Sequence, residues 1–211
     1  MAEDSSQEGL PLRWRFAKRQ AKALALPSAF RLLTKRPPDP SAMPFTPILA
    51  TLAYVFSPDG RRVLLVHRNR RPGDAHLGKY NGLGGKLERD EDVVACVRRE
   101  VREESGLECE ALELRGTISW PGFGKGGEDW FGFVFRVDRF RGEPWRENVD
   151  GVLEWVEVER VLQLPLWEGD RHFVPLVFAA GAAQFHGVMP YRDGRPVSWT
   201  YSVLEPPGAA S

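Results

Sequence analysis

The chain has 211 residues, of which 42% are hydrophobic and 27% are charged, an ordinary composition for a globular protein with one sizeable core. No apolar run approaches the ~20 residues that cross a bilayer, and two cysteines are too few for a disulfide framework. Composition thus argues against a helical membrane span and a disulfide-rich domain. We expect a reducing, cytoplasmic setting, with Cys96 as a small buried residue.

The formal net charge is zero, but the charges are unevenly spread. Residues 1–42 carry eight Lys and Arg against four acids and end in a proline-rich linker, whereas 43–211 are mildly acidic. Such a basic arm is typical of an amphipathic helix on membrane or nucleic acid, a transit-like segment, or upstream sequence that is not native. We favour the last, with Met43 as the start, or a disordered tail, over contact with nucleic acid. The predicted domain is therefore 43–211.

Patterns of β-branched and aromatic residues predict the strands, which are 46–56, 62–67, 112–120, 129–137, 152–158, 185–191 and 197–204. Helical spacing predicts one helix within 85–107 and another at 170–180, with Asp170 as its cap and Gly181 ending it. Residues 159–163 are expected to form a short helix or turn. Strands surrounding two helices indicate an α+β layer architecture.

The segment 85–107 carries the strongest motif. Gly85 is followed after five residues by Glu91, and seven residues later comes Arg99. The rest of the motif is Glu100, an aliphatic residue, Glu103, Glu104, and Gly106 before another aliphatic residue.

This motif makes physical sense as a helix that binds a metal ion. Glu100, Glu103 and Glu104 would share one face, where their like charges favour a cation such as Mg²⁺ or Mn²⁺. Val94, Val97 and Val101 would pack on the core from another face, while Gly106 would cap the C-terminus. Arg99 lies four residues before Glu103 and could brace it. A solvated acidic helix face is the alternative, but it does not account for the matched glycines, Glu91 and Arg99.

The motif resembles the Nudix box, the signature of hydrolases that cut a nucleoside diphosphate linked to another group. The resemblance implies an α/β/α sandwich on a mixed sheet. It also implies that Glu100, Glu103, Glu104 and the Gly85 carbonyl hold Mg²⁺ (or Mn²⁺), with Arg99 orienting Glu103.

Over about 46–204 the chain is similar to the MutT branch, in particular the human MutT homologue that hydrolyses oxidised purine nucleoside triphosphates. The segment 79–86 resembles that branch's strand into the box, 166–176 its Trp-Pro-Asp-Asp segment and helix, and 185–187 its last hairpin.

The MutT branch binds the base with an asparagine, a tryptophan and an acidic pair, which correspond to Asn81, Trp167 and Asp170 here; Lys86 is also assigned to substrate. An amide and a carboxyl can read a purine edge, and an indole can stack on it. These residues could instead be a strand end, plain core and a helix cap. Gly169 replaces the first acid of the pair, which weakens the expectation of strict selectivity for 8-oxoguanine.

An additional acid that the family uses near its metals corresponds to Asp150, with Glu147 as the alternative. Glu103, Glu104 or Asp150 could then accept a proton from the attacking water. The histidines show no ligand spacing and receive no chemical role.

The resemblance implies cleavage of purine nucleoside triphosphates such as 8-oxo-dGTP to monophosphate and pyrophosphate by a monomer or homodimer. The alternatives are another Nudix substrate (a dinucleoside polyphosphate, a nucleotide sugar or a 5′-triphosphate RNA) or a non-catalytic nucleotide sensor. An intact set of glutamates argues against the sensor.

Overall fold

The computed structural model describes residues 44–70, 77–179, 181 and 183–204. The chain divides into two units, Met1–Met43 and Pro44–Ser211, and every described residue belongs to the second. The predicted extension at 1–42 lies outside the described residues, so the proposed domain boundary stays a prediction.

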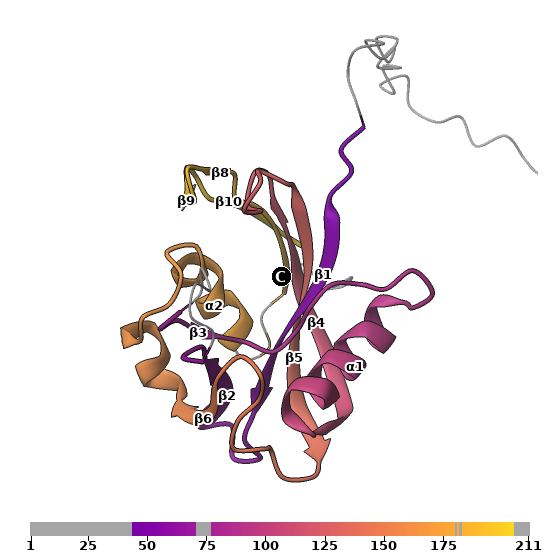
Figure 1. The fold of residues 1–211 in the computed structure, drawn as a ribbon, viewed down its shortest axis with the longest axis vertical. Helices are drawn as coiled ribbons and strands as arrows, with labels where there is room; N and C mark the ends of the chain where they lie inside the picture. The colour runs from indigo at the N-terminus through magenta and orange to yellow at the C-terminus, as the bar shows by residue number, and fades with distance from the viewer. Residues whose placement is uncertain (1–43, 71–76, 180, 182, 205–211) are drawn as a thin grey trace, which may run out of the picture. The chain divides into compact units, whose positions relative to one another are not determined.

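A mixed β-sheet runs through the centre of the described chain (Figure 1). The strand order is β10-β7-β4-β5-β1-β2-β3, and β6 also pairs with β2. The strand bounds are β1 Ile48–Phe56, β2 Arg62–His67, β3 Tyr80–Asn81, β4 Glu108–Trp120, β5 Trp130–Arg141, β6 Val152–Glu157, β7 Gln184–Val188 and β10 Thr200–Leu204. A short separate hairpin joins β8 Tyr191–Arg192 to β9 Arg195–Pro196. Strands β1 and β5 pair in parallel, as do β4 and β7, whereas the other pairs are antiparallel.

Two helices cover opposite faces of this sheet (Figure 1). Helix α1, Val93–Ser105, packs Val97 and Val101 into one core cluster. Helix α2, Asp170–Phe178, packs Phe173 and Val177 into the other. Adjacent residues of β1 alternate between the two clusters, as the period of a strand requires. The predicted α/β/α sandwich with a mixed sheet is confirmed.

Three local predictions were wrong. The side chain of Val94 is not in the core, since the residue is 41% exposed in the first turn of α1. Asp170 does not cap α2; the cap position is Gly169, so Asp170 is the first helical residue and its carboxyl is available for another contact. The helix ends at Phe178 rather than near Gly181, since Ala179 is already extended, and Arg115 and Arg136 donate to carbonyls at this end.

The predicted turn at 159–163 is a 3-10 helix, η1 Val158–Gln163. Cys96 is fully buried, as expected, and neither cysteine forms a disulfide. None of the helices in the described part of the chain has the length and apolar character to cross a membrane.

Candidate active site

Helix α1 is defined at both ends by side-chain and backbone caps. Asp92 accepts hydrogen bonds from the backbone N–H groups of Val94 and Ala95, which have no partner within the helix. Gly106 ends the helix in the left-handed conformation at φ 78°, as the sequence predicted. Between these two caps the chain is helical, so Glu100, Glu103 and Glu104 lie on one face of α1.

The glycine loop before α1 lies directly against the carboxylates. A Cβ on Gly85 would lie 2.5 Å from Glu100 Oε1, so a larger residue would displace that carboxylate. The N–H of Gly84 donates to Glu104 Oε2 at 2.8 Å. Gly84 has φ +147° and meets the Thr51 carbonyl so closely that no side chain fits. Both glycines therefore place bare backbone at the carboxylate face of α1.

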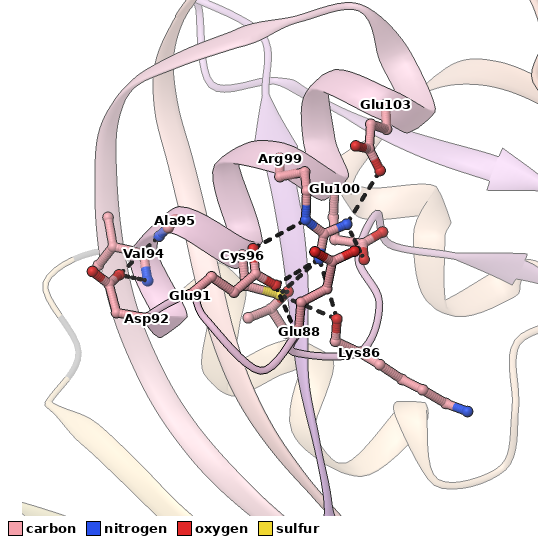
Figure 2. Close-up of polar contacts among 11 residues, drawn as sticks. Lys86, Glu88, Glu91, Asp92, Val94, Ala95, Cys96, Arg99, Glu100 and Glu103 are labelled. Carbon is pink, nitrogen blue, oxygen red and sulfur yellow. Dashed lines mark hydrogen bonds and ion pairs between the residues drawn. The ribbon is translucent and has the colours of Figure 1, made fainter.

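Arg99, in helix α1, is the centre of an ion-pair network with three glutamates (Figure 2). Its guanidinium binds Glu91 through two bonds, Nε to Oε2 at 3.0 Å and Nη2 to Oε1 at 2.7 Å. Its Nη1 also donates to Glu100 at 2.8 Å and to Glu103 at 3.1 Å. The expected brace on Glu103 is present, but Glu91 is the partner held by two bonds. Its hydrogen bonds to Arg99 lower the pKa of Glu91 to about 2.

Glu104 is the most perturbed carboxyl of this face. Burial raises its pKa to about 8, the hydrogen bond from Gly84 opposes the rise, and the charges of Glu100 and Asp150 add to it. These charges show that Asp150 lies near the carboxylates of α1, although it comes from the loop before β6. Asp150 pairs with Arg68 at 3.0 Å.

Glu147, the alternative to Asp150, is more exposed and is engaged elsewhere. It forms an ion pair with Arg70, and half of its side chain is accessible to solvent. Both acids line a cavity of about 360 Å³ beside Glu103 and Glu104, but of the two only Asp150 also lines the larger cavity described below.

The donor set fits a hard divalent cation. Three carboxylates and a carbonyl in a glycine loop supply the oxygen ligands that Mg²⁺ prefers, and the charge of Glu100 adds to the rise in pKa that burial causes at Glu104. In the conformation of the described residues, no three acidic, His or Cys side chains converge on one point, since Arg99 draws Glu100 and Glu103 while Gly84 holds Glu104. The metal ligands Gly85, Glu100, Glu103 and Glu104 therefore stay a prediction.

A cavity of about 960 Å³ joins this loop to the residues expected to bind a base. Six of its lining residues were assigned to the site from the sequence, namely Asn81, Gly85, Lys86, Asp150, Trp167 and Asp170. Its size is that of a ligand pocket. The residues predicted to bind the base therefore share one cavity with Gly85, Lys86 and Asp150, whereas Glu103 and Glu104 line the smaller cavity instead.

At the base end, two polar side chains have hydrogen-bonding capacity that a ligand could fill. Asn81 Oδ1 is buried and has no hydrogen-bond partner among the described residues, which is costly unless a ligand supplies one. Burial raises the pKa of Asp170 to about 7, opposed by Lys79 and by the backbone of Trp167. Lys79 Nζ also lies 5.4 Å from the centre of the Trp167 ring.

Sequence reasoning missed an aromatic wall in the same cavity, made by Trp120, Phe123, Trp130, Phe173 and Tyr191. The ring of Phe123 packs edge-on against the rings of Trp130 and Tyr191, with 5.9 and 5.0 Å between the ring centres. Lys86 Nζ lies 5.2 Å from the centre of the Trp130 ring. The signal available was Phe123 within a loop of glycines, where a large apolar residue is unexpected on a solvated turn.

Comparisons with known proteins show which family the chain belongs to. A model of the NUDIX domain matches residues 46–177. An oxidized purine nucleoside triphosphate hydrolase from Danio rerio is 35% identical over 133 residues, which cover 63% of this chain and 81% of that protein. The Mus musculus protein of the same name is 33% identical over 157 residues, which cover 74% and 94%. The crystal structure of the MutT protein of Bacillus halodurans superposes with a TM-score of 0.64 at 29% identity, covering 73% of this chain and 97% of that one.

The chain therefore belongs to the Nudix hydrolases, a family that generally uses a divalent metal ion. Its similarity to MutT proteins and to oxidized purine nucleoside triphosphate hydrolases confirms the resemblance drawn from the sequence.

Proposed function

We propose that this Nudix hydrolase is a Mg²⁺-dependent pyrophosphohydrolase that cleaves purine nucleoside triphosphates, oxidised ones such as 8-oxo-dGTP included, to monophosphate and pyrophosphate. The observation that carries the proposal is the single cavity that Asn81, Trp167 and Asp170 share with Gly84 and Gly85. The names of the fish and mouse relatives support the same substrate class.

At the phosphate end, Glu100, Glu103, Glu104 and the Gly85 carbonyl would hold the metal ions. When bound, the metal neutralises phosphate charge and lowers the pKa of a water molecule. Arg99 is anchored on Glu91 and bonded to Glu100 and Glu103 in the metal-free protein, and it would orient Glu103 when the metal binds. Lys86, which is exposed at the cavity, adds positive charge for the phosphates.

The proton of the attacking water would pass to Glu104, Glu103 or Asp150. Glu104 is the best placed of the three, because the hydrogen bond from Gly84 occupies only Oε2 and leaves Oε1 for the water.

At the other end, Asn81 and Asp170 would bind the edge of the base and Trp167 would stack on its face. An amide can donate and accept at once, and the buried Asn81 Oδ1 would receive its missing partner from the base. The aromatic wall encloses the base and excludes water from these hydrogen bonds.

A substrate panel with Mg²⁺ tests the proposal. Release of pyrophosphate is measured from 8-oxo-dGTP, 2-hydroxy-dATP, dGTP and dATP, and compared with hydrolysis of a dinucleoside polyphosphate, a nucleotide sugar and a 5′-triphosphate RNA. We expect the highest kcat/KM among the four purine triphosphates, with Glu104→Gln as the inactive control. Faster hydrolysis of any of the other three substrates would assign the site to that class instead. Nucleotide binding without hydrolysis of any substrate would indicate a sensor.

A further inference from the structure

Tyr191 is held at the edge of the cavity by its backbone and its ring. Its N–H donates to the Pro121 carbonyl at 2.7 Å, and its ring meets Phe123 edge-on with 5.0 Å between ring centres. Two anchors on the 121–127 loop therefore fix the side chain, which lines the same cavity as Asn81 and Asp170.

The hydroxyl of Tyr191 fills space that Gly169 leaves open. A Cβ on Gly169 would lie 2.6 Å from Met189 Sδ and closer still to Tyr191 Oη, too close for either atom to stay in place. The backbone of Gly169 is right-handed helical, at φ −62° and ψ −36°, a conformation that suits any residue. A side chain at position 169 is therefore excluded by the Tyr191 hydroxyl, and not by the backbone conformation of Gly169.

This hydroxyl lies beside Asp170 and keeps its proton. Burial raises the pKa of Tyr191, and the negative charges of Asp170 and Glu168 raise it further. A phenol that stays protonated can donate one hydrogen bond and accept another, whereas an ionised carboxyl can only accept.

We propose, on the basis of the proposed function, that the Tyr191 hydroxyl hydrogen-bonds an exocyclic polar group of the purine base, in space that Gly169 opens beside Asp170. The hydroxyl is then the third polar group that hydrogen-bonds the base, together with the side chains of Asn81 and Asp170. Because it can donate or accept, it can match either an exocyclic oxygen or an exocyclic amino group.

Tyr191→Phe removes the hydroxyl and keeps the ring against Phe123. The kinetics of this variant are measured on dGTP, on dATP and on the triphosphate of unsubstituted purine deoxyriboside, whose base has no exocyclic polar group. We expect kcat/KM to fall about 5- to 150-fold on dGTP and dATP, the range for a buried polar group that loses its partner. On the unsubstituted purine it should change less than about 2-fold, since that base has nothing for the hydroxyl to bind.

Tyr201→Phe is the matched control, because it deletes the same hydroxyl from an exposed residue of β10 that does not line the cavity. It should behave as the parent on all three substrates. Gly169→Ala supplies a second route to the same effect. Its methyl group displaces the Tyr191 hydroxyl without backbone strain, so it should reproduce the base-dependent loss, and thermal melting verifies that both pocket variants fold.

An equal loss on all three substrates, or no more loss than Tyr201→Phe shows, would overturn the inference while the parent remained an active purine triphosphatase. Parental kinetics in Gly169→Ala would overturn the role given to the glycine. If the parent hydrolysed no purine triphosphate, the proposed function would fail first, and this inference with it.

Discussion

Replacing Glu104 with glutamine should stabilise the metal-free protein while it abolishes hydrolysis. Glu104 is buried between the glycine loop and α1, and its pKa is raised to about 8 by burial and by the charges of Glu100 and Asp150. Glutamine has nearly the same shape and can still accept the hydrogen bond from Gly84. The substitution therefore removes the ionisation and little else.

The sign and size of the effect follow from the pKa. In the unfolded chain Glu104 ionises near its ordinary value of 4.5, whereas in the folded protein it ionises near 8. Between these values the folded state keeps a proton that the unfolded state has lost, so stability falls as pH rises from 4.5 to 8. At about 1.4 kcal/mol per pKa unit the ceiling is about 5 kcal/mol, and relaxation of the site and water that enters it reduce the expected value to about 2 kcal/mol.

Urea unfolding in the presence of a chelator measures the effect at pH 5 and pH 9. Glu104→Gln should exceed the parent by less than about 1 kcal/mol at pH 5 and by about 2 kcal/mol at pH 9. Glu103→Gln is the control, since that side chain is 53% exposed and should show no such difference. With Mg²⁺, turnover of Glu104→Gln should fall at least ~10²-fold. An equal stability difference at both pH values, or lower stability of Glu104→Gln at pH 9, would refute the electrostatic reasoning.

Four further predictions concern other parts of the chain. Asn81→Ala and Asp170→Ala should raise KM for purine triphosphates by the equivalent of ~1–3 kcal/mol each, with Mg²⁺ affinity unchanged in a titration without nucleotide; equal kinetics to the parent would place base recognition elsewhere. Because the pKa of Asp170 is about 7, KM of the parent should change between pH 6 and pH 8, and this change should be absent in Asp170→Asn. Arg99→Lys cannot keep the two bonds to Glu91, so kcat should fall roughly 10-fold and the melting temperature should drop; an unchanged kcat would remove Arg99 from the site. A protein of residues 43–211 should keep the melting temperature and turnover of the full chain, because both core clusters and the cavity lie within it; a loss of either would show that 1–42 contribute.

The parts of the fold that the sequence predicted are those set by local pattern. The strand at 62–67 was predicted at its observed bounds, and Gly106 caps α1 as expected, because alternation and left-handed glycine are properties of neighbouring residues. The parallel pairing of β1 with β5 was not predictable in this way. Pairing between strands 80 residues apart depends on how the faces of the whole sheet are covered, which no local window contains.

The candidate site divides along the same line. The spacing of Glu100, Glu103 and Glu104 indicated a shared helix face, which follows from the helical period alone. The two-bond pair between Arg99 and Glu91 was missed, because Glu91 lies before the helix, where no period applies. Tyr191 was missed for a stronger reason, since it reaches Gly169 only through the folding of β8 against the 121–127 loop.

The distance between the two ends of the cavity is set by one short segment of chain. Asn81 belongs to the base end, while Gly84 and Gly85 belong to the carboxylate end, three and four residues later. The segment is fixed to β1 by two hydrogen bonds between Ala53 and Leu83 and by the Thr51 N–H bond to the Gly85 carbonyl. Extended backbone spans about 3.3 Å per residue, so the two ends are about 10–13 Å apart, the scale of a single nucleotide. Because β1 lies inside the sheet between β5 and β2, this spacing is rigid, and under the proposed function the site would favour substrates that separate base and phosphate by that length.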